Sequence, residues 1–330
     1  MAKRSSRPDG AKKRMSRGVL IALWVVIGIL FLVAICAILA IVSRVPMPIA
    51  DAETEITAGE AEASASAAPE ESAAPAETPL PEELQEAPLS PDEEVAARTA
   101  VRADGFPMLS HEPENFSLDS SGRMTYSGET YLTGIDVSEH QGKIDWEKVA
   151  ADGVDFVMIR MGYRGSTAGG LYTDEYFTEN IAGANAAGID VGVYFYSQAV
   201  TPEEALEEAD YVLEAIRPYK VTFPVVFDWE IVGGSEARTY TVSRAVLCEC
   251  AEAFCDAVED EGYDAMIYFT QYLGYRKYIL RRLTDYEFWY AEYEAQPRIV
   301  FDFDMWQYSS TGKVNGIDGD VDLNIYFRKE

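Results

Sequence analysis

Two carboxylic acids stand one residue apart where the apolar run 223–227 ends in Asp228, Trp229 and Glu230. A short apolar run of this kind is typical of a buried strand. Because side chains alternate along a strand, the sequence predicts that Asp228 and Glu230 point to the same side, with their backbones roughly 6–7 Å apart. Glycosidases use one acid to protonate the leaving oxygen and a second to stabilise or attack the sugar. The pattern therefore indicates cleavage of a glycosidic bond; the alternative is a strand that ends in a solvated acidic turn.

Further acids are expected at the same edge of the sheet. Asp136 lies near the end of the apolar run 132–137, and Asp322 lies in the acidic run 318–324. Asp320 stands on the same alternation as Asp322, so spacing alone leaves the choice between them open. We expect Asp136 and Asp322 to join Asp228 and Glu230 around one sugar-sized hollow.

The acidic run 318–324 resembles a calcium loop only superficially. Such a loop needs Gly at its sixth position and Glu at its twelfth, where this chain has Leu323 and Lys329. We therefore predict that the protein uses neither a metal nor a cofactor.

Aromatic residues are frequent in the same runs, and their rings suit the apolar faces of sugars while their polar tips bond to hydroxyl groups. Strand positions alternate between two faces, so part of this set must belong to the core instead. The predicted groove-lining residues are Tyr163, Tyr194, Tyr196, Trp229, Tyr268 and Trp306.

Apolar runs alternate with amphipathic stretches from residue 131 onward, which indicates a parallel sheet covered by helices. The predicted strands are 132–137, 154–161, 190–196, 223–227, 265–269, 287–291 and 303–308, and the predicted helices are 146–151, 175–187, 202–216, 242–261 and 271–283. After Leu283 the helical patterns fade. We expect an irregular α/β barrel of the TIM-barrel-like type whose late strands lack helices. The active site of such a barrel lies at the C-terminal ends of its strands.

The chain before this domain divides by composition. Residues 1–18 are rich in Lys and Arg, 19–42 contain no charged residue, and 43–104 are rich in Ala, Glu, Pro and Ser. An apolar run of this length crosses a bilayer, and a basic flank stays in the cytoplasm. We predict a cytoplasmic tail, one transmembrane helix and a disordered linker, with the rest of the chain extracellular. The alternative is a signal peptide cleaved near Ala37 or Ala40.

Residues 105–130 form an irregular lead-in that partly packs on the catalytic domain, which comprises residues 131–330 in this prediction. The net charge of −29 and the pI near 4.3 argue against a nucleic-acid partner. Cys248, Cys250 and Cys255 are predicted to be small buried residues, because three cysteines outside the membrane span cannot all pair. We expect a monomer.

Residues 131–330 resemble the glycoside hydrolase family 25 lysozymes, the Chalaropsis-type N-acetylmuramidases. The matching motifs occur in the family's order: Gly134-Ile135-Asp136-Val137-Ser138, Gln141-Gly142, Ile144-Asp145-Trp146, Tyr194-Phe195-Tyr196, Asp228-Trp229-Glu230, Trp306-Gln307-Tyr308 and Val321-Asp322-Leu323-Asn324. The resemblance implies an irregular α/β barrel that cleaves the β-1,4 bond between N-acetylmuramic acid and N-acetylglucosamine in peptidoglycan.

Carried over to this chain, the resemblance makes Glu230 the proton donor and Asp228, Asp136 and Asp322 its acidic partners. Phe195 stands where the family often has histidine, which puts fine substrate contacts in question. Retaining, inverting and substrate-assisted mechanisms all stay open, since side-chain rotamers span the separations that distinguish them. Substrate-assisted retention is preferred by resemblance only.

A bacterial cell-wall remodelling enzyme tethered to the membrane is the predicted function, with peptidoglycan glycan strands as its substrate. Two rival functions are a catalytically silent module that tethers the wall, and a glycosidase for another polysaccharide.

Overall fold

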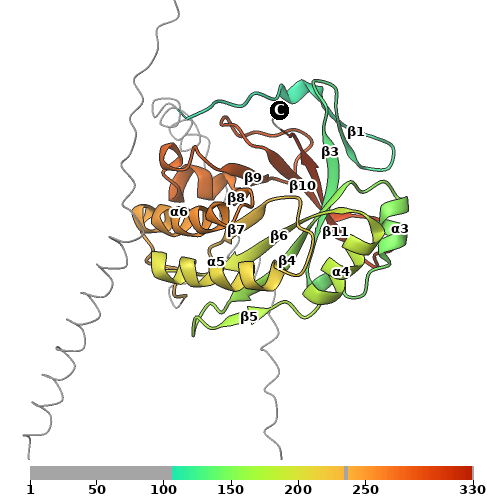
Figure 1. Ribbon diagram of the computed structural model, residues 1–330. Coiled ribbons are helices and arrows are strands. Elements are labelled where there is room, and N and C mark those ends of the chain that lie inside the picture. The colour runs from blue at the N-terminus through green and yellow to red at the C-terminus, as the bar shows by residue number, and fades with distance from the viewer. Residues whose placement is uncertain (1–105, 234–236, 329–330) are drawn as a thin grey trace, which may run out of the picture. The chain divides into compact units, whose positions relative to one another are not determined.

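Eight strands close into a barrel in the computed structural model, which describes residues 106–233 and 237–328 (Figure 1). In ring order from β3 the neighbours are β4, β6, β7, β8, β9, β10 and β11, and β11 returns to β3. The short strand β5 (Leu171–Thr173) adds to the outer edge of β4 as an antiparallel partner. The barrel strands are β3 (Leu132–Val137), β4 (Phe156–Arg164), β6 (Asp190–Ser197), β7 (Val225–Trp229), β8 (Ala265–Thr270), β9 (Glu287–Ala291), β10 (Met305–Gly312) and β11 (Val321–Tyr326).

The predicted barrel is therefore present, but it departs from a TIM barrel in two ways. Its last strand, β11, runs antiparallel to both neighbours, because it follows β10 as a hairpin partner rather than after a helical crossover. Among the described residues, α-helices also follow only β3, β4, β6 and β7 on the way to the next barrel strand. They are α3 (Trp146–Ala151), α4 (Phe177–Ala187), α5 (Pro202–Ile216) and α6 (Arg244–Asp260). In Figure 1, α5 and α6 lie side by side over β6, β7 and β8.

The helix predicted over residues 271–283 is not formed. In its place are one π-helical turn, η4 (Leu273–Lys277), and one 3-10 turn, η5 (Leu280–Arg282). Gly274 lies where there is no room for a side chain, since a Cβ there would lie 2.5 Å from the Phe301 ring. The segment therefore packs tightly on the barrel instead of continuing as a regular helix.

The regular helices begin where the sequence supplies a cap. The Thr201 side chain accepts a hydrogen bond from the Glu204 amide, and Pro202 occupies the first turn of α5. Ser243 caps α6 in the same way. Helix α4 ends at Gly188, whose φ of 77° is a left-handed conformation that favours glycine.

The lead-in packs against the outside of the barrel. It holds the 3-10 turn η2 (Pro113–Asn115) and the hairpin of β1 (Phe116–Leu118) and β2 (Met124–Tyr126). Phe116 is 3% exposed and meets the Trp306 ring edge-on, with ring centroids 5.1 Å apart. His111 stacks on Phe327 at 3.9 Å. The observed packing of this segment is thus far more extensive than the partial packing that the sequence predicted.

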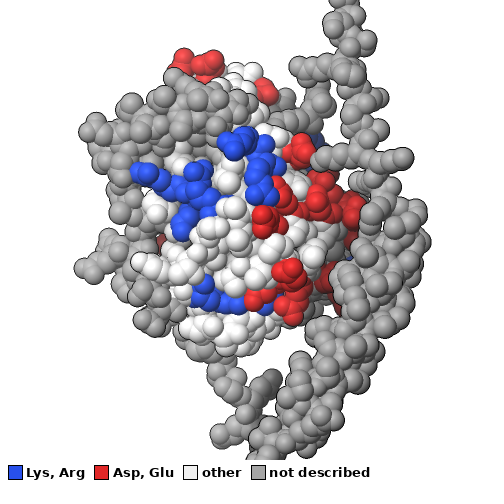
Figure 2. All heavy atoms as spheres, turned by 90° about the vertical axis from the view of Figure 1, so that its left-hand side faces the viewer, with Lys and Arg blue, Asp and Glu red and all other residues white. Residues whose placement is uncertain are grey.

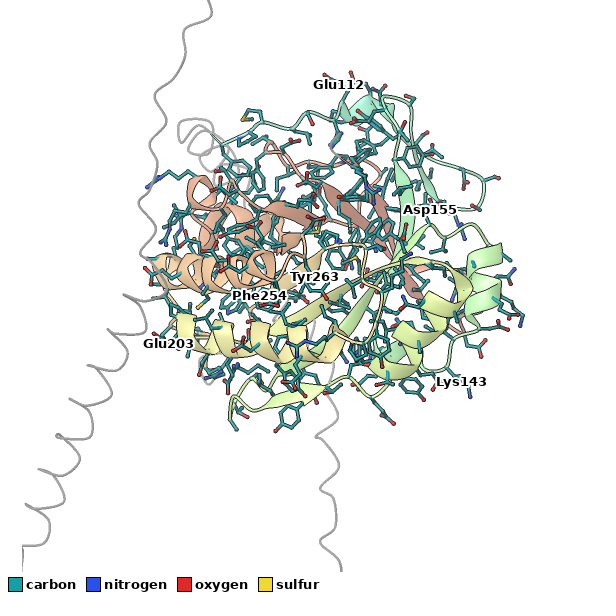
Figure 3. All side chains as sticks on the ribbon, in the orientation of Figure 1. Glu112, Lys143, Asp155, Glu203, Phe254 and Tyr263 are labelled. Carbon is teal, nitrogen blue, oxygen red and sulfur yellow. The ribbon has the colours of Figure 1, made fainter. Side chains whose placement is uncertain are left out.

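Two apolar clusters lie on opposite faces of the barrel strands. The larger fills the space between the strands, the helices and the lead-in; Phe254 of α6 meets Phe227 of β7 there, at 5.4 Å (Figure 3). The smaller fills the barrel interior and includes Met158, Val226 and Met305. The three predicted small buried cysteines are confirmed, since each is buried in the outer cluster with a free thiol.

The predicted basic tail, transmembrane helix and linker (1–18, 19–42 and 43–104) lie outside the described residues. None of the helices in the described part combines the length and the apolar composition that crossing a bilayer requires. On the face of the domain shown in Figure 2, basic side chains lie beside acidic ones rather than in one continuous basic patch.

Candidate active site

The inner face of the barrel collects acids from three strands at one end. Asp136 lies near the C-terminal end of β3, and Asp228 lies near that of β7. Asp322 is the second residue of β11, and because this strand is antiparallel its start lies at the same end. Asp322 pairs directly with Asp136 in the register, so their Cβ atoms are about 4.5–5.5 Å apart.

Asp136 is held by two buried amides. The side chains of Gln307 and Asn324 each donate a hydrogen bond of 2.8 Å to its Oδ2. Burial raises the pKa of Asp136 to about 6, although the bonds from Asn324 and Gln307 oppose the rise. The carboxyl is therefore oriented by donors that favour its ionised form.

Asp228 and Glu230 form a hydrogen-bonded pair. Burial raises the pKa of Asp228 well above its usual range, and the negative charges of Glu230 and Asp136 and the hydrogen bond with Glu230 raise it further. Two carboxyl groups that lie this close repel each other when both are ionised, which favours a proton on the pair. Glu230 is half-buried, whereas Asp228 is 5% exposed.

One oxygen of this pair is left without a partner. Among the described residues nothing bonds to Asp228 Oδ1, although it is buried. A buried acceptor without a donor is costly in a closed core. At the end of a barrel, such an oxygen can instead accept a hydrogen bond from an N–H or O–H group of a bound molecule.

Asp322, not Asp320, belongs to the acid group. Burial raises the pKa of Asp322 to about 8, and the neighbouring charge of Asp136 adds to the effect. Asp320 is exposed and pairs with Lys313 at 2.7 Å. Strand alternation would place Asp320 and Asp322 on the same face, but β11 begins at Val321. Asp320 therefore lies outside the strand and does not follow its alternation.

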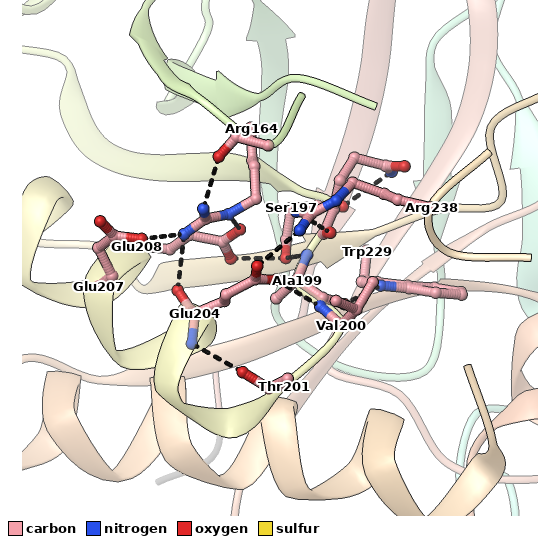
Figure 4. A network of polar contacts seen from close by, with 12 residues as sticks. Arg164, Ser197, Ala199, Val200, Thr201, Glu204, Glu207, Glu208, Trp229 and Arg238 are labelled. Atoms are coloured by element: carbon pink, nitrogen blue, oxygen red, sulfur yellow. Dashed lines mark hydrogen bonds and ion pairs between the residues drawn. The ribbon is translucent and has the colours of Figure 1, made fainter. Parts of the chain in front are cut away.

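The segment that carries Glu230 is fastened to the segment after β6. Gln198 is fully buried, and its side-chain amide donates to the Glu230 carbonyl at 3.0 Å. Trp229 Nε1 donates to the Ala199 carbonyl at 3.1 Å. Figure 4 shows the surrounding network, in which Arg238 bonds to the Gln198 carbonyl and to Glu204. These contacts fix the backbone from which Glu230 projects.

Four of the predicted aromatic residues face the acids or lie close to them. Burial raises the pKa of Tyr194 well above its usual range, and Arg160, Asp136, Asp228 and Asp322 all act on its hydroxyl. Tyr268 lies beside Asp228 in the register and bonds to Gln307 at 3.4 Å. Tyr196 is the other register neighbour of Asp228, and Tyr163 pairs with Tyr196. Tyr194 and Tyr268, whose pKa values burial raises, stay protonated and can donate hydrogen bonds.

Trp229 and Trp306 do not line the site, which corrects the expectation for both. Each is fully buried in the outer cluster, on the face of its strand opposite the acids. Trp306 Nε1 donates to the Glu292 carbonyl at 2.9 Å. Their role is to pack the strands against the helices and the lead-in. Phe195 also faces outward and packs against Tyr211 of α5, so the departure from the family pattern lies away from the acids.

Several residues of the site were not predicted. Gln307 lies two residues after Met305 on β10, and Asn324 lies two residues after Asp322 on β11, so each faces inward like its neighbour. This spacing is the signal that could have found them. Trp289 faces inward on β9 and donates to Asn324 Oδ1 at 2.8 Å.

Tyr293 follows β9 in a loop, where no periodic pattern points to it. Its ring is 55% exposed, yet its hydroxyl donates to Gln307 at 3.0 Å. Negative charges of the acid group act on this hydroxyl as well. The residue therefore places an exposed aromatic face at the rim of the acid group.

In the described part of the chain, no group of three or more His, Cys, Asp or Glu side chains has the arrangement of a metal site. A hollow of about 700 Å³ lies elsewhere, between the lead-in and the segment 297–300, and includes none of the four acids among its lining residues.

Comparisons with known proteins agree with this geometry. The model of the family described as glycosyl hydrolases family 25 matches residues 135–317, more than half of the chain. An autolytic lysozyme from Clostridium acetobutylicum is 29% identical over 197 residues, which are 59% of this chain and 56% of that protein. The chain thus spans little more than half the length of this relative.

Two solved structures share the fold. The modular autolysin LytC from Streptococcus pneumoniae, in complex with a synthetic peptidoglycan ligand, is 25% identical, with a TM-score of 0.53 over 67% of this chain and 52% of that one. A family 25 glycosyl hydrolase from Bacillus anthracis is 22% identical, with a TM-score of 0.52 over 64% of this chain and 96% of that one.

Proposed function

Because the chain belongs to family 25 of the glycosyl hydrolases, we propose that it is a peptidoglycan hydrolase that cleaves the β-1,4 bond between N-acetylmuramic acid and N-acetylglucosamine. The observation that carries the proposal is the group of four acids at one end of the barrel, where Asp228 lies beside Glu230 and Asp136 pairs with Asp322 across the neighbouring strands. A proton donor next to a second carboxyl is what hydrolysis of a glycosidic bond requires.

In this proposal Glu230 protonates the glycosidic oxygen as the bond to the anomeric carbon breaks. Glu230 suits the role because it is half-buried and lies just beyond the end of β7, nearer to the opening than Asp228. Asp228 then bears the negative charge that stabilises the positive charge at the anomeric carbon.

Substrate assistance is the stereochemical course we favour. The unpartnered Oδ1 of Asp228 can accept a hydrogen bond from the N–H of the sugar's acetamido group, which turns the acetamido oxygen toward the anomeric carbon. Asp136 and Asp322 bind sugar hydroxyls beside this group, and Tyr194 and Tyr268 donate to them.

Muropeptide analysis tests the proposal. Full-length protein is incubated with purified peptidoglycan, and the products are reduced and analysed by mass spectrometry. Reduced N-acetylmuramic acid ends are expected. Reduced N-acetylglucosamine ends, cleavage of other polysaccharides only, or binding without new reducing ends would each contradict it.

Glu230→Gln should lower turnover by about 10²–10⁴-fold, because the proton of the acid is lost. Asp320→Asn is the matched control: this acid is two residues from Asp322, exposed and paired with Lys313, so turnover should stay near that of the wild type. Near-normal turnover of Glu230→Gln would reject the assignment.

We also propose that residues 19–42 anchor the enzyme in the cell membrane, with the N-terminus in the cytoplasm and the catalytic domain outside. The support is the uncharged run of that length after a basic flank. A flexible linker over 43–104 spans about 40–50 Å on average, so the anchor restricts cutting to wall close to the membrane. Removal of residues 1–104 should leave activity on soluble wall fragments intact and release the protein from the membrane fraction.

A further inference from the structure

The short strand β5 carries the barrel wall beyond the end of β3. On one edge of β4, β3 pairs only as far as Val137 with Ile159. Further along, β5 pairs with residues 162–164 of β4, and because β6 occupies the other edge there, β5 continues the edge that β3 leaves (Figure 1). These residues are the C-terminal end of β4, which is the end of the barrel where the acids meet. The strand β5 therefore stands at the rim of the candidate active site.

A row of tyrosines crosses the sheet from β5 to the acids. Tyr172 on β5 pairs with Tyr163 on β4. Tyr163 pairs in turn with Tyr196 on β6, which pairs with Asp228 on β7. Register partners on neighbouring strands point to the same face of a sheet. The row therefore places Tyr172 on the same face as Asp228, three strands away.

A β-bulge in β4 makes this row possible. Arg160 pairs with Tyr194, which packs on the inner cluster, and the register with β6 then shifts between Arg160 and Gly162. Because of this shift, Tyr163 stays on the inner face although it lies three residues after Arg160. Gly162 lets β5 approach closely, since a Cβ there would lie 2.2 Å from the Tyr172 carbonyl oxygen.

The residue next to Tyr172 faces the other way. The hydroxyl groups of Thr173 and Tyr211 of α5 form a hydrogen bond of 2.5 Å. Because side chains alternate along a strand, Tyr172 lies on the face of β5 away from α5. Tyr172 is 42% exposed there, so a large part of its side chain is open to a ligand.

The position of the Tyr172 ring is fixed by stacking. The ring lies against that of Tyr163, with centroids 5.2 Å apart and planes 23° from parallel. On Tyr163 acts also the Arg160 guanidinium, whose carbon lies 5.7 Å from the ring centroid. Arg160 is held in turn, because its Nε donates to buried Asp174 at 2.8 Å. A ring fixed in this way loses little conformational entropy when a ligand packs against it.

The row is longer than one sugar ring. Adjacent strands lie about 4.8 Å apart, so the backbones of β5 and β7 are about 14 Å apart along the sheet. A sugar bound against Tyr172 is therefore a different unit from the one whose bond is cut beside Asp228 and Glu230. A chain of linked sugars reaches both places, and an aromatic side chain with a hydroxyl group suits the apolar faces and the hydroxyl groups of such a chain.

We infer that β5 carries an outer glycan subsite, in which Tyr172 packs against a sugar unit remote from the cleaved bond, so that the protein acts best on long glycan strands. The inference rests on the proposed function, because it takes the same glycan as the ligand. In this role Tyr172 determines the preferred substrate length and takes no part in the chemical step.

Substrate length provides the test. Full-length protein in detergent is assayed on soluble peptidoglycan glycan strands without stem peptides, and on the shortest fragments that it still cuts. Tyr172→Ala should raise KM on the long strands by about 2–10-fold, the scale of one aromatic contact, with little change in kcat. On the short fragments KM should stay at the wild-type value, because these fragments do not reach β5.

Three further variants serve as controls. Tyr172→Phe keeps the ring and should keep KM on long strands within about twofold of wild type. Tyr172→Leu removes the ring but keeps apolar bulk, so it should raise KM in the same direction and serves if Tyr172→Ala does not fold. Leu206→Ala removes an apolar side chain that is 44% exposed on α5, outside the barrel, and it should change KM on neither substrate.

Two outcomes would overturn the inference. One is a folded Tyr172→Ala protein with the wild-type KM on long strands. The other is an equal rise in KM on long and short substrates, which would place the effect at the acids instead of at β5.

A binding measurement keeps the inference apart from the proposed function. Long strands are titrated by calorimetry into Glu230→Gln protein, and adding Tyr172→Ala should raise Kd by the same factor as KM. Binding that depends on Tyr172 without any new N-acetylmuramic acid ends from the wild type would reject the function and keep the subsite. Cleavage as proposed with no effect of Tyr172→Ala would keep the function and reject the subsite.

Discussion

The acids of the site differ in what holds them, and this difference gives them separate tasks. Asp136 receives two amide hydrogen bonds, whereas Asp228 lies next to Glu230 and its buried Oδ1 has no hydrogen-bond partner among the described residues. An oriented carboxylate suits the binding of sugar hydroxyls. A pair of adjacent carboxyl groups suits transfer of a proton to a leaving group.

Tyr293 is expected to act as a platform for a sugar ring. Tyr293→Ala should raise KM by about 2–10-fold with a smaller change in kcat, because an aromatic contact is worth about 0.5–1.5 kcal/mol and binds substrate and transition state alike. Tyr293→Phe keeps the ring and loses only the bond to Gln307, so its KM should stay close to wild type. Steady-state kinetics on soluble glycan fragments measure both, and equal KM values for Tyr293→Ala and wild type would exclude the platform.

At the scale of elements, the site depends on two loops that are joined at the C-terminal ends of β6 and β7. Gln198 lies at their junction: it donates to the Ser197 and Glu230 carbonyls and accepts from the Thr239 hydroxyl. The buried Arg164–Glu208 pair and the bond from Ser197 to Glu208 tie the base of the same loop to α5. The loops are therefore fixed by polar contacts rather than by apolar packing alone.

Gln198→Ala should lower kcat by about 10–100-fold with little change in KM, because a displacement near 1 Å of the proton donor costs on that order. Asn185→Ala is the matched control. Its amide also bridges two backbone segments, through the Lys220 carbonyl and amide, but it lies before β7 begins, at the other end of the barrel. Equal loss of activity in both variants would show that the effect is general destabilisation.

At the scale of the whole molecule, the buried acids make stability depend on pH. Asp136 and Asp322 have folded pKa values of about 6 and about 8, above the ordinary value of 3.8, and burial also raises the pKa of Glu208 to about 7. A group with a raised pKa contributes stability that is complete below its unfolded pKa and is lost as the pH rises through its folded pKa.

The free energy of unfolding should therefore fall as the pH rises from about 4 to about 8, and the midpoint temperature should fall with it. Asp322→Asn should raise the midpoint at pH 8 by about 2–4 °C for each kcal/mol gained and flatten the profile between pH 6 and 8. Asp320→Asn serves as the control, since this residue is exposed. Thermal unfolding followed by circular dichroism gives the profile, and a rise in stability toward pH 8 would contradict the argument.

The sequence by itself determined the alternation of strands and helices through β8 and the acids of the site. Apolar runs bounded by helix caps, such as Thr201 before Pro202, act locally and need no knowledge of the fold. The outward position of Trp229 was also within reach, because the alternation that places Asp228 and Glu230 on one face places Trp229 on the other.

Only the tertiary structure decided which faces of β10 and β11 point inward, because closure of the barrel through an antiparallel strand is a long-range event. That closure places Gln307 rather than Trp306, and Asp322 rather than Asp320, in the site. The bulge on β4 that brings Tyr163 level with Tyr196 likewise occurs where β5 packs against Gly162. Local patterns specify elements, but the site arises where distant elements meet, and the contacts between them are set by packing rather than by spacing along the chain.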